Sequence, residues 1–205
     1  MRKFSQKALV IATHNEGKLQ EIKKLFENYR LTINSAAEFG LEEPEETENS
    51  FIGNARIKAH YASKKTGLPA LSDDSGIEVE SLQGAPGVYT ADWAETENGR
   101  DFQFAMEKVW EKVQTTNYIS PYAAQFCSTL VLAWPDGHDE VFTGIIKGTL
   151  VWPIQGNNGH GFDPMFKPHG YNLTFAQMNR WEKNRISHRG LAFTKMLKHC
   201  FMKYP

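Results

Sequence analysis

Cysteine is scarce in this sequence, whose 205 residues include 2, Cys127 and Cys200. Both lie among apolar residues and do not have the spacing of a metal-binding pair, so we expect buried, reduced thiols. Unpaired thiols of this kind are usual in a reducing compartment. The cysteine content therefore favours a cytoplasmic protein.

Long hydrophobic runs and an excess of one charge are also missing. The apolar runs fall well short of the roughly 20 residues that a membrane-spanning helix requires. The start, Met1-Arg2-Lys3-Phe4, lacks the apolar core of a secretory signal. The formal net charge is -1, whereas a general nucleic-acid-binding protein normally presents a basic face. We therefore predict no membrane and no nucleic-acid partner.

The residues that are present have the balance of an ordinary globular protein, with 40% hydrophobic and 23% charged residues. The length fits one large domain or two tightly joined lobes, and we predict a single functional domain over residues 1–205. The hydrophobic periodicity predicts strands at about 8–12, 77–80, 123–134 and 140–152, and helices at about 19–29, 50–65, 101–114 and from residue 187.

A polar turn follows the first expected strand and leads into the first expected helix. Asn15 is placed to cap that helix, and Lys18 adds a positive charge to its first turn. Backbone N–H groups at a helix start attract anions, so the segment Thr13 to Lys18 is suited to hold a phosphate. It is not a Walker loop, because Leu19 follows Lys18 where that motif has Ser or Thr. An ordinary capped helix with a solvated lysine is the alternative interpretation.

Two adjacent carboxylates, Asp73 and Asp74, stand between a short apolar segment and the alternating segment 77–80. Gly76 lets the backbone turn sharply, so we expect the carboxylates at a bend just before a strand. Neighbouring carboxylates resist ionising together unless a cation lies between them, and oxygen ligands suit Mg²⁺. The alternative is a polar turn in which the Asp and Ser side chains bond their own backbone.

Charged residues also stand at two other expected helix starts. The acidic loop 42–49 leads into the helix at 50–65, for which Asn49 is the expected cap. Acidic side chains there suit the helix dipole without any catalytic role. His188 and Arg189 fall in the first turn of the last helix, behind Ser187 as its cap. Cations at that position oppose the dipole, and such local violations gather at working sites.

Six blocks of residues form a specific combination. They are Ala12 to Lys18, Glu45-Glu46-Thr47 with Phe51 and Asn54-Ala55, Asp73-Asp74-Ser75-Gly76, Gly84 to Tyr89, Gly161-Phe162-Asp163-Pro164, and Glu182-Lys183 with Ser187-His188-Arg189. In this order and at this spacing they resemble, over nearly the whole chain, the inosine/xanthosine triphosphate pyrophosphatase family. That family hydrolyses non-standard purine nucleoside triphosphates. The resemblance implies this activity, Mg²⁺ as cofactor, a homodimer, and an elongated α/β fold with a mixed central sheet flanked by helices and two lobes around a substrate cleft.

Residue roles follow from the same resemblance. Asp74 is implied as general base and metal ligand, and Glu45 as the second metal ligand, with the adjacent Glu46 as the alternative. The residues from 13 to 18 are implied to hold the triphosphate, and those from 160 onward to surround the nucleobase. The full set of implied substrate-binding residues is Thr13, His14, Asn15, Glu16, Gly17, Lys18, Ser75, His160, Gly161, Phe162, Asp163, Lys183, His188 and Arg189.

The sequence departs from the family pattern at two places. His160 stands where relatives usually have an aromatic residue that stacks on the base, which leaves more of the stacking to Phe162. Thr90 and Asp92 stand where relatives often have Ser and Arg, and no role is assigned to either.

Two other functions stay open at this point. One is a Maf-like nucleotide pyrophosphatase with a different base preference, which a panel of substrates separates. The other is a nucleotide-binding sensor without turnover, which would not need the carboxylates of Glu45 and Asp74.

Overall fold

The computed structural model describes residues 1–201. Its strands are β1 Ala8–Ile11, β2 Thr32–Ser35, β3 Ala70–Val79, β4 Glu95–Thr96, β5 Gly99–Arg100, β6 Ala123–Ala133, β7 Asp139–Leu150 and β8 Phe166–Pro168. Its α-helices are α1 Glu16–Leu25, α2 Phe51–Thr66, α3 Phe102–Gln114, α4 Arg180–Ile186 and α5 His188–Cys200. Short 3-10 helices lie at Ala37–Phe39, Glu80–Leu82, Gly87–Thr90, Asp92–Ala94 and Asp163–Met165. None of the helices described in residues 1–201 is long and apolar enough to cross a membrane.

Six strands form one sheet in the order β2-β1-β3-β6-β7-β8, and β4 pairs with β5 separately. β1 runs parallel to both of its neighbours, with Ala8 opposite Thr32 on β2 and Val10 opposite Ala70 on β3. β8 runs antiparallel to β7. The mixed α/β sheet that the family resemblance implied is therefore confirmed.

The chain forms two compact units. The first comprises Met1–Asp74, Thr129–Thr143 and the chain from Ala192, and the second comprises Ser75–Ser128 and Gly144–Leu191. Each unit has its own hydrophobic core. Both cysteines are buried free thiols, as predicted. A single functional domain over residues 1–205 stays a prediction.

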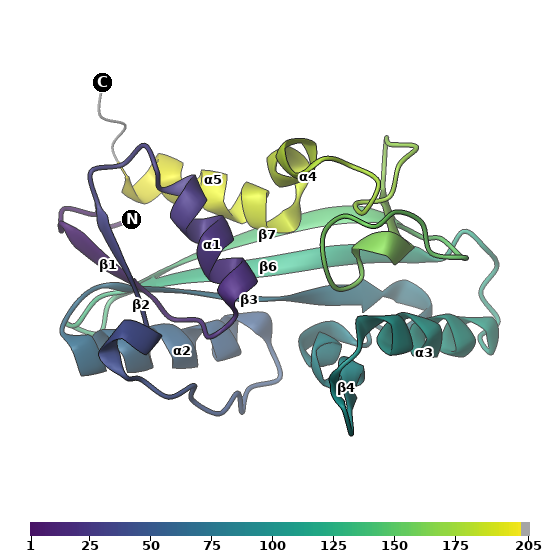
Figure 1. Ribbon diagram of the computed structural model, residues 1–205, viewed down its shortest axis with the longest axis horizontal. Coiled ribbons are helices and arrows are strands. Elements are labelled where there is room, and N and C mark those ends of the chain that lie inside the picture. Colours follow the sequence, from purple (N-terminus) through teal and green to yellow (C-terminus); the bar gives the residue numbers. More distant parts are fainter. Residues whose placement is uncertain (202–205) are drawn as a thin grey trace. The chain divides into compact units, whose positions relative to one another are not determined.

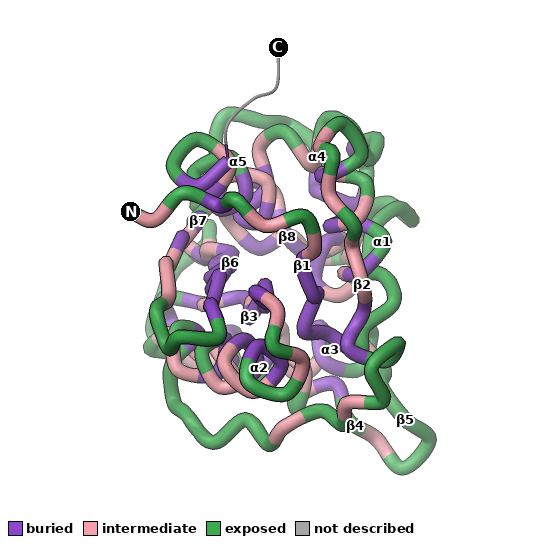
Figure 2. Tube along the Cα trace, turned by 90° about the vertical axis from the view of Figure 1, so that its left-hand side faces the viewer, coloured by how far each residue is buried: buried purple, intermediate pink, exposed green. Residues whose placement is uncertain are grey.

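In the first unit, helices cover both faces of β1 (Figure 1). Leu9 and Ile11 pack with residues of α1 and α5 on one face, and Val10 packs with α2 on the other. All three side chains are fully buried, and Figure 2 shows β1 as a buried strand. The face of α2 that meets the sheet carries small residues, as predicted: Ala55, Ala59 and Ala62.

Side chains cap the starts of α1 and α2 in the first unit. Asn15 caps α1 as predicted, since its Oδ1 accepts a hydrogen bond from the Lys18 N–H at 3.0 Å. The prediction that Asn49 caps α2 is wrong by one residue. Ser50 is the cap, and its Oγ accepts from the Gly53 N–H at 3.1 Å. α2 begins one residue later than predicted, and the cap must be the residue just before the helix.

The bend expected at Gly76 is a wrong prediction. β3 runs without interruption from Ala70 to Val79, so Asp73, Asp74 and Gly76 lie inside a strand. β3 pairs with β1 at Ala70 and Leu71 and stands next to β6 in the sheet. A place inside the sheet outweighs the freedom of a glycine, which adopts extended backbone as well as turns. Successive strand residues point to opposite faces, so the two carboxylates are directed away from each other.

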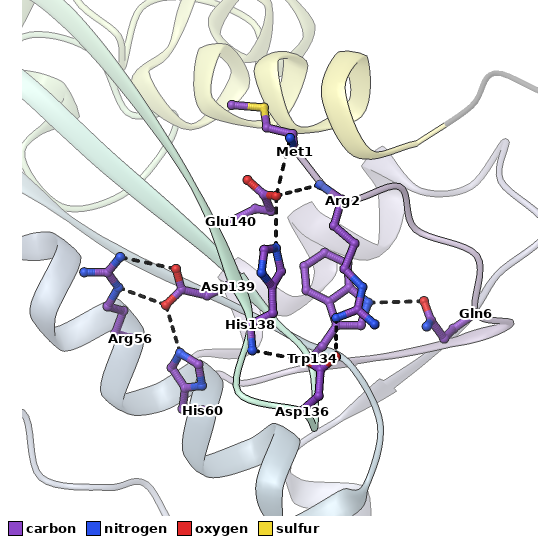
Figure 3. A network of polar contacts seen from close by, with 10 residues as sticks. All are labelled: Met1, Arg2, Gln6, Arg56, His60, Trp134, Asp136, His138, Asp139 and Glu140. Carbon is purple, nitrogen blue, oxygen red and sulfur yellow. Dashed lines mark hydrogen bonds and ion pairs between the residues drawn. The ribbon is translucent and has the colours of Figure 1, made fainter.

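The β6–β7 hairpin of the first unit is tied to α2 and to the N-terminal segment (Figure 3). Asp139 accepts a hydrogen bond from Arg56 Nε at 2.9 Å and lies 2.9 Å from His60 Nε2. Glu140 accepts from the backbone N–H of Arg2 at 2.6 Å. Burial acts to raise the pKa of Asp139, but the contacts with Arg56 and His60 hold this pKa below its ordinary value.

Candidate active site

A buried lysine of α2 links two acidic residues that are distant in the sequence. Lys58 is 5% exposed, and its Nζ lies 2.8 Å from Glu46 Oε1 and 3.3 Å from Asp74 Oδ1. Glu46 belongs to the acidic loop before α2, whereas Asp74 belongs to β3. Acidic groups from these two regions converge on a lysine of the protein itself, a residue that sequence reasoning missed.

Asp74 has the properties of a reactive carboxyl group. Burial, opposed by the nearby Lys58 ammonium group, raises its pKa to about 6. Its Oδ1 faces Lys58, whereas its Oδ2 is buried and has no hydrogen-bond partner within residues 1–201. Leaving a buried polar atom unpaired is costly. The position at Oδ2 is therefore suited to a ligand such as a water or a cation.

The carboxylates at this site fit a metal ion that needs few protein ligands. Residues 1–201 contain no ready group of three or more histidine, cysteine, aspartate or glutamate side chains that could hold one. Mg²⁺ does not require such a cage, because it usually binds through one or two carboxylates and fills its other positions with water and phosphate oxygens. The Oδ2 atom of Asp74, with a glutamate of the acidic loop, fits that smaller requirement.

The two glutamates considered as second metal ligand have different surroundings. Glu46 is engaged by Lys58. Glu45 is exposed, and within residues 1–201 its carboxylate makes no hydrogen bond or ion pair. Glu45 can therefore accept a ligand without giving up an existing contact, whereas one oxygen of Glu46 already binds Lys58.

Asp73 pairs with the lysine of the polar turn. Lys18 Nζ lies 2.9 Å from Asp73 Oδ2, and the Asp73 side chain is completely buried. The turn is closed by its own side chains, since Thr13 Oγ1 accepts a hydrogen bond from the Asn15 N–H at 3.2 Å. Asp73 and Asp74 thus each have a lysine of their own instead of one cation between them.

The remaining residues of this turn are exposed. His14 Nε2 lies 2.8 Å from the carbonyl oxygen of Leu41. Glu16 accepts a hydrogen bond from Gln20 at 2.6 Å, within α1. Gly17 lies in the first turn of α1, where its backbone N–H belongs to the free helix start.

The second unit holds a separate polar cluster around Asp163. This residue is 2% exposed, pairs with Lys183 of α4 and accepts a hydrogen bond from the His160 N–H at 2.8 Å. Gly159 has a φ of +77°, and a side chain there would collide with the Asp163 carboxylate. The glycine-rich loop is therefore shaped around this buried acid.

The two aromatic candidates for base stacking differ in depth. His160 is exposed at the surface of the loop. Phe162 is 1% exposed, and its ring packs edge-on against Phe102 with centroids 6.1 Å apart. Because the Phe162 ring is buried under the loop, a ligand at the loop surface would meet the backbone of Gly161 and Phe162 instead of the ring.

The start of α5 holds two cationic candidates in fixed positions. Ser187 caps the helix as predicted, since its Oγ accepts from the Gly190 N–H at 3.1 Å. Arg189 is 4% exposed and donates from Nη2 to Ser75 Oγ at 3.1 Å. The ring of His188 stacks on Phe126, with centroids 4.7 Å apart and planes within 9°. The second unit therefore presents Ser75 and Arg189 as one hydrogen-bonded pair.

Comparison with known proteins finds similarity along almost the entire chain. The profile of the Ham1 family matches residues 9–199. A dITP/XTP pyrophosphatase of Ruegeria pomeroyi is 60% identical over 200 residues, which cover 98% of this chain and 98% of that protein. One of Agrobacterium fabrum is 48% identical over 211 residues, covering 98% and 99%. The structure of a HAM1 protein from Coxiella burnetii aligns with a TM-score of 0.87 at 32% identity, covering 94% of this chain and 98% of that one.

Proposed function

The chain belongs to the Ham1 family, and we propose that it is a nucleoside-triphosphate pyrophosphatase. It hydrolyses non-standard purine nucleoside triphosphates (ITP, dITP and XTP) to the monophosphate and pyrophosphate. The names of its relatives support this substrate class. The observation that carries the mechanism is the buried Asp74 carboxyl group beside Lys58, with one oxygen that lacks a partner among the described residues.

We assign the triphosphate to cationic groups of the first unit. The N–H groups at the start of α1 and the positive end of its dipole favour an anion in the turn from Thr13 to Lys18. Lys18 and Lys58 add full charges there. Both pair with carboxylates. Each ammonium group has three N–H donors, so it can also bind phosphate oxygens while it keeps its carboxylate partner.

Asp74 is the catalytic residue of this proposal. Asp74 and Glu45 would hold Mg²⁺, with Glu46 as the alternative to Glu45. The bound ion would neutralise phosphate charge and lower the pKa of a neighbouring water. Asp74 orients the attacking water for in-line displacement at the α-phosphorus. Its pKa, which burial raises to about 6, leaves the group mostly ionised at neutral pH and basic enough to accept a proton.

Selection of the base is assigned to donors in the second unit. Hypoxanthine and xanthine carry a keto oxygen at C6, where adenine carries an amino group. Lys183, His188 and Arg189 can donate hydrogen bonds to an oxygen but meet an amino group unfavourably. Sites built on such hydrogen bonds reject a mismatched analogue by as much as about 10⁴-fold. The loop from His160 to Asp163 and the Ser75 hydroxyl complete the contacts we propose for the substrate.

The assembly and cellular location are further parts of the proposal. The homodimer rests on the family resemblance and is tested by light scattering of the purified protein. A cytoplasmic location is supported by the two buried free thiols, Cys127 and Cys200. No nucleic-acid or membrane partner is proposed.

The decisive experiment incubates the pure protein with Mg²⁺ and each of ITP, dITP, XTP, ATP, GTP, dTTP and CTP. The expected result is pyrophosphate release from the first three, with little from the others and no accumulation of single phosphate. Preferred hydrolysis of other nucleotides would favour the Maf-like alternative. Binding without any product would favour a nucleotide sensor.

A further inference from the structure

The acidic loop that carries Glu45 and Glu46 lies next to a narrow pocket. Residues 41–48 form neither helix nor strand, and most of them are exposed. The pocket lies between the loop and α2, and its loop side is lined by Leu41, Glu42, Glu43 and Pro44. Leu41 at the start of the loop packs against the apolar cluster that contains Val10 and Ala62. The exposed acidic residues that follow it depend on polar contacts for their position.

The far end of the loop is held to α2. Lys58 Nζ lies 2.8 Å from Glu46 Oε1, and the Glu48 N–H donates to Asn54 Oδ1 at 2.9 Å. These contacts fix the end that leads into the helix. They do not fix the start of the loop, on the other side of the two candidate metal ligands.

His14 supplies a side-chain contact at the start of the loop, beside the backbone hydrogen bond from the Leu41 N–H to the Ala36 carbonyl oxygen. Its Nε2 lies 2.8 Å from the Leu41 carbonyl oxygen, and because a carbonyl only accepts, Nε2 must carry a hydrogen. Its Nδ1 lies 4.0 Å from Glu43 Oε2. Both ring nitrogens thus face the loop, and the Nε2–H group is already used. His14 is the neighbour of Thr13 in the turn assigned to the triphosphate, but its ring is directed at the protein.

We propose that His14 is a positioning residue that holds loop 41–48 against the turn and keeps Glu45 and Glu46 within reach of Asp74. It does not bind phosphate itself. The inference rests on the proposed function, because the carboxylates that it positions are the ones assigned to the metal ion and Lys58.

The test compares the wild type with His14→Ala, His14→Gln and the control His169→Ala, which removes an exposed histidine of the second unit. The first readout is amide hydrogen exchange of the nucleotide-free protein at Leu41 and Glu48, whose N–H groups are hydrogen-bonded. We expect faster exchange at Leu41 in His14→Ala, and unchanged exchange at Glu48, which α2 holds independently. Exchange in His14→Gln should match the wild type, because the glutamine amide can still donate to Leu41.

The second readout is the Mg²⁺ concentration that gives half-maximal pyrophosphate release. It should rise about three- to tenfold in His14→Ala, the loss expected for one net hydrogen bond. The KM for ITP at saturating Mg²⁺ should not change. His14→Gln and His169→Ala should both behave as the wild type.

Two results would overturn the inference. One is unchanged exchange at Leu41 in His14→Ala. The other is an equal rise of the KM for ITP in His14→Ala and His14→Gln at saturating Mg²⁺, which would make His14 a phosphate ligand. A wild-type protein that releases no pyrophosphate would overturn the proposed function alone, since the exchange measurement judges the loop contact without any turnover.

Discussion

Asp73 and Asp74 are adjacent in β3 but pair with different lysines, Lys18 at 2.9 Å and Lys58 at 3.3 Å. The alternation of the strand directs their side chains to opposite faces. Among the causes that shift the pKa of Asp74, burial is the largest and the neighbouring Asp73 is the smallest of those identified. The pKa of Asp74 is thus raised mainly by its burial in the first unit, and only slightly by repulsion from Asp73.

The raised pKa of Asp74 should make the stability of the metal-free protein depend on pH. Burial raises the pKa of Asp74 from 3.8 to about 6, so between these values the folded protein binds more protons than the unfolded chain. Its free energy of unfolding must then fall as the pH rises through this range. The shift corresponds to about 3 kcal/mol. We expect urea unfolding of wild type and Asp74→Asn to show the wild type losing about this amount relative to the variant from pH 4 to pH 7.

Asp139→Asn is the matched control with the opposite sign. Contacts with Arg56 and His60 outweigh the effect of burial and hold the pKa of Asp139 below its ordinary value. This carboxylate stabilises the fold above its ordinary pKa, and the contribution is lost as the pH falls through the lowered value. The wild type should therefore gain stability over Asp139→Asn as the pH rises in the acidic range. Parallel curves for Asp74→Asn and wild type would refute the assignment of the raised pKa.

Removing the charge of Lys58 should move the pKa of Asp74 further upward. In Lys58→Met the burial of Asp74 and the repulsion from Glu46 remain, while the attraction that lowers its pKa is lost. The carboxyl pKa, followed by NMR of the metal-free protein, should then exceed 6. The stability deficit of this variant should also grow with pH, because ionisation of Asp74 leaves a buried charge without its partner.

Lys58→Arg serves as the control for this prediction. It retains the positive charge near Asp74, so the carboxyl pKa should stay close to the wild-type value. If Lys58→Met and wild type titrate alike at Asp74, the contact between the two side chains does not govern the site.

Lys58 could have been found from the sequence, although sequence reasoning missed it. It follows Ala55 by three residues and precedes Ala59, on the helix face that also carries Ala62. A charged side chain on an otherwise small and buried helix face is stable only when it is paired. The partners, however, lie 12 and 16 residues away, and no periodicity identifies which carboxylates they are.

Other parts of the fold show which signals are readable and which depend on tertiary structure. Strand β1, helix α1 and its Asn15 cap are local features, and the sequence predicted their presence correctly. The end of α1 was predicted about four residues too late, because the helix stops at Leu25. Helix α4 was missed, although its capping box of Asn179 and Glu182 is a local signal. The straight course of β3 through Gly76 was mispredicted, because it depends on neighbouring strands that are distant in the sequence.

Asp74→Asn should abolish turnover at every pH while leaving nucleotide binding largely intact. The amide is close in size to the carboxyl group but cannot accept a proton from water, and loss of a proton acceptor typically costs about 10² to 10⁴ in rate. Pyrophosphate release from ITP between pH 5 and 9, together with calorimetric titration of the nucleotide, separates the two effects. Turnover near the wild-type rate at any pH in this range would remove Asp74 from the chemistry.

The assignment of the second metal ligand should follow from comparing Glu45→Gln with Glu46→Gln. Because Lys58 engages Glu46, whereas Glu45 has no hydrogen bond or ion pair among residues 1–201, we expect Glu45→Gln to raise the Mg²⁺ requirement of pyrophosphate release more strongly. Loss of one charged ligand contact is worth about 1.5 to 3 kcal/mol, so the half-saturating Mg²⁺ concentration should rise by roughly ten- to a hundredfold. Glu46→Gln should mainly alter the titration of Asp74, since it removes a repulsive charge and should lower that pKa. The reverse pattern, with the larger Mg²⁺ effect in Glu46→Gln, would mean that Lys58 gives up Glu46 to the metal ion during turnover.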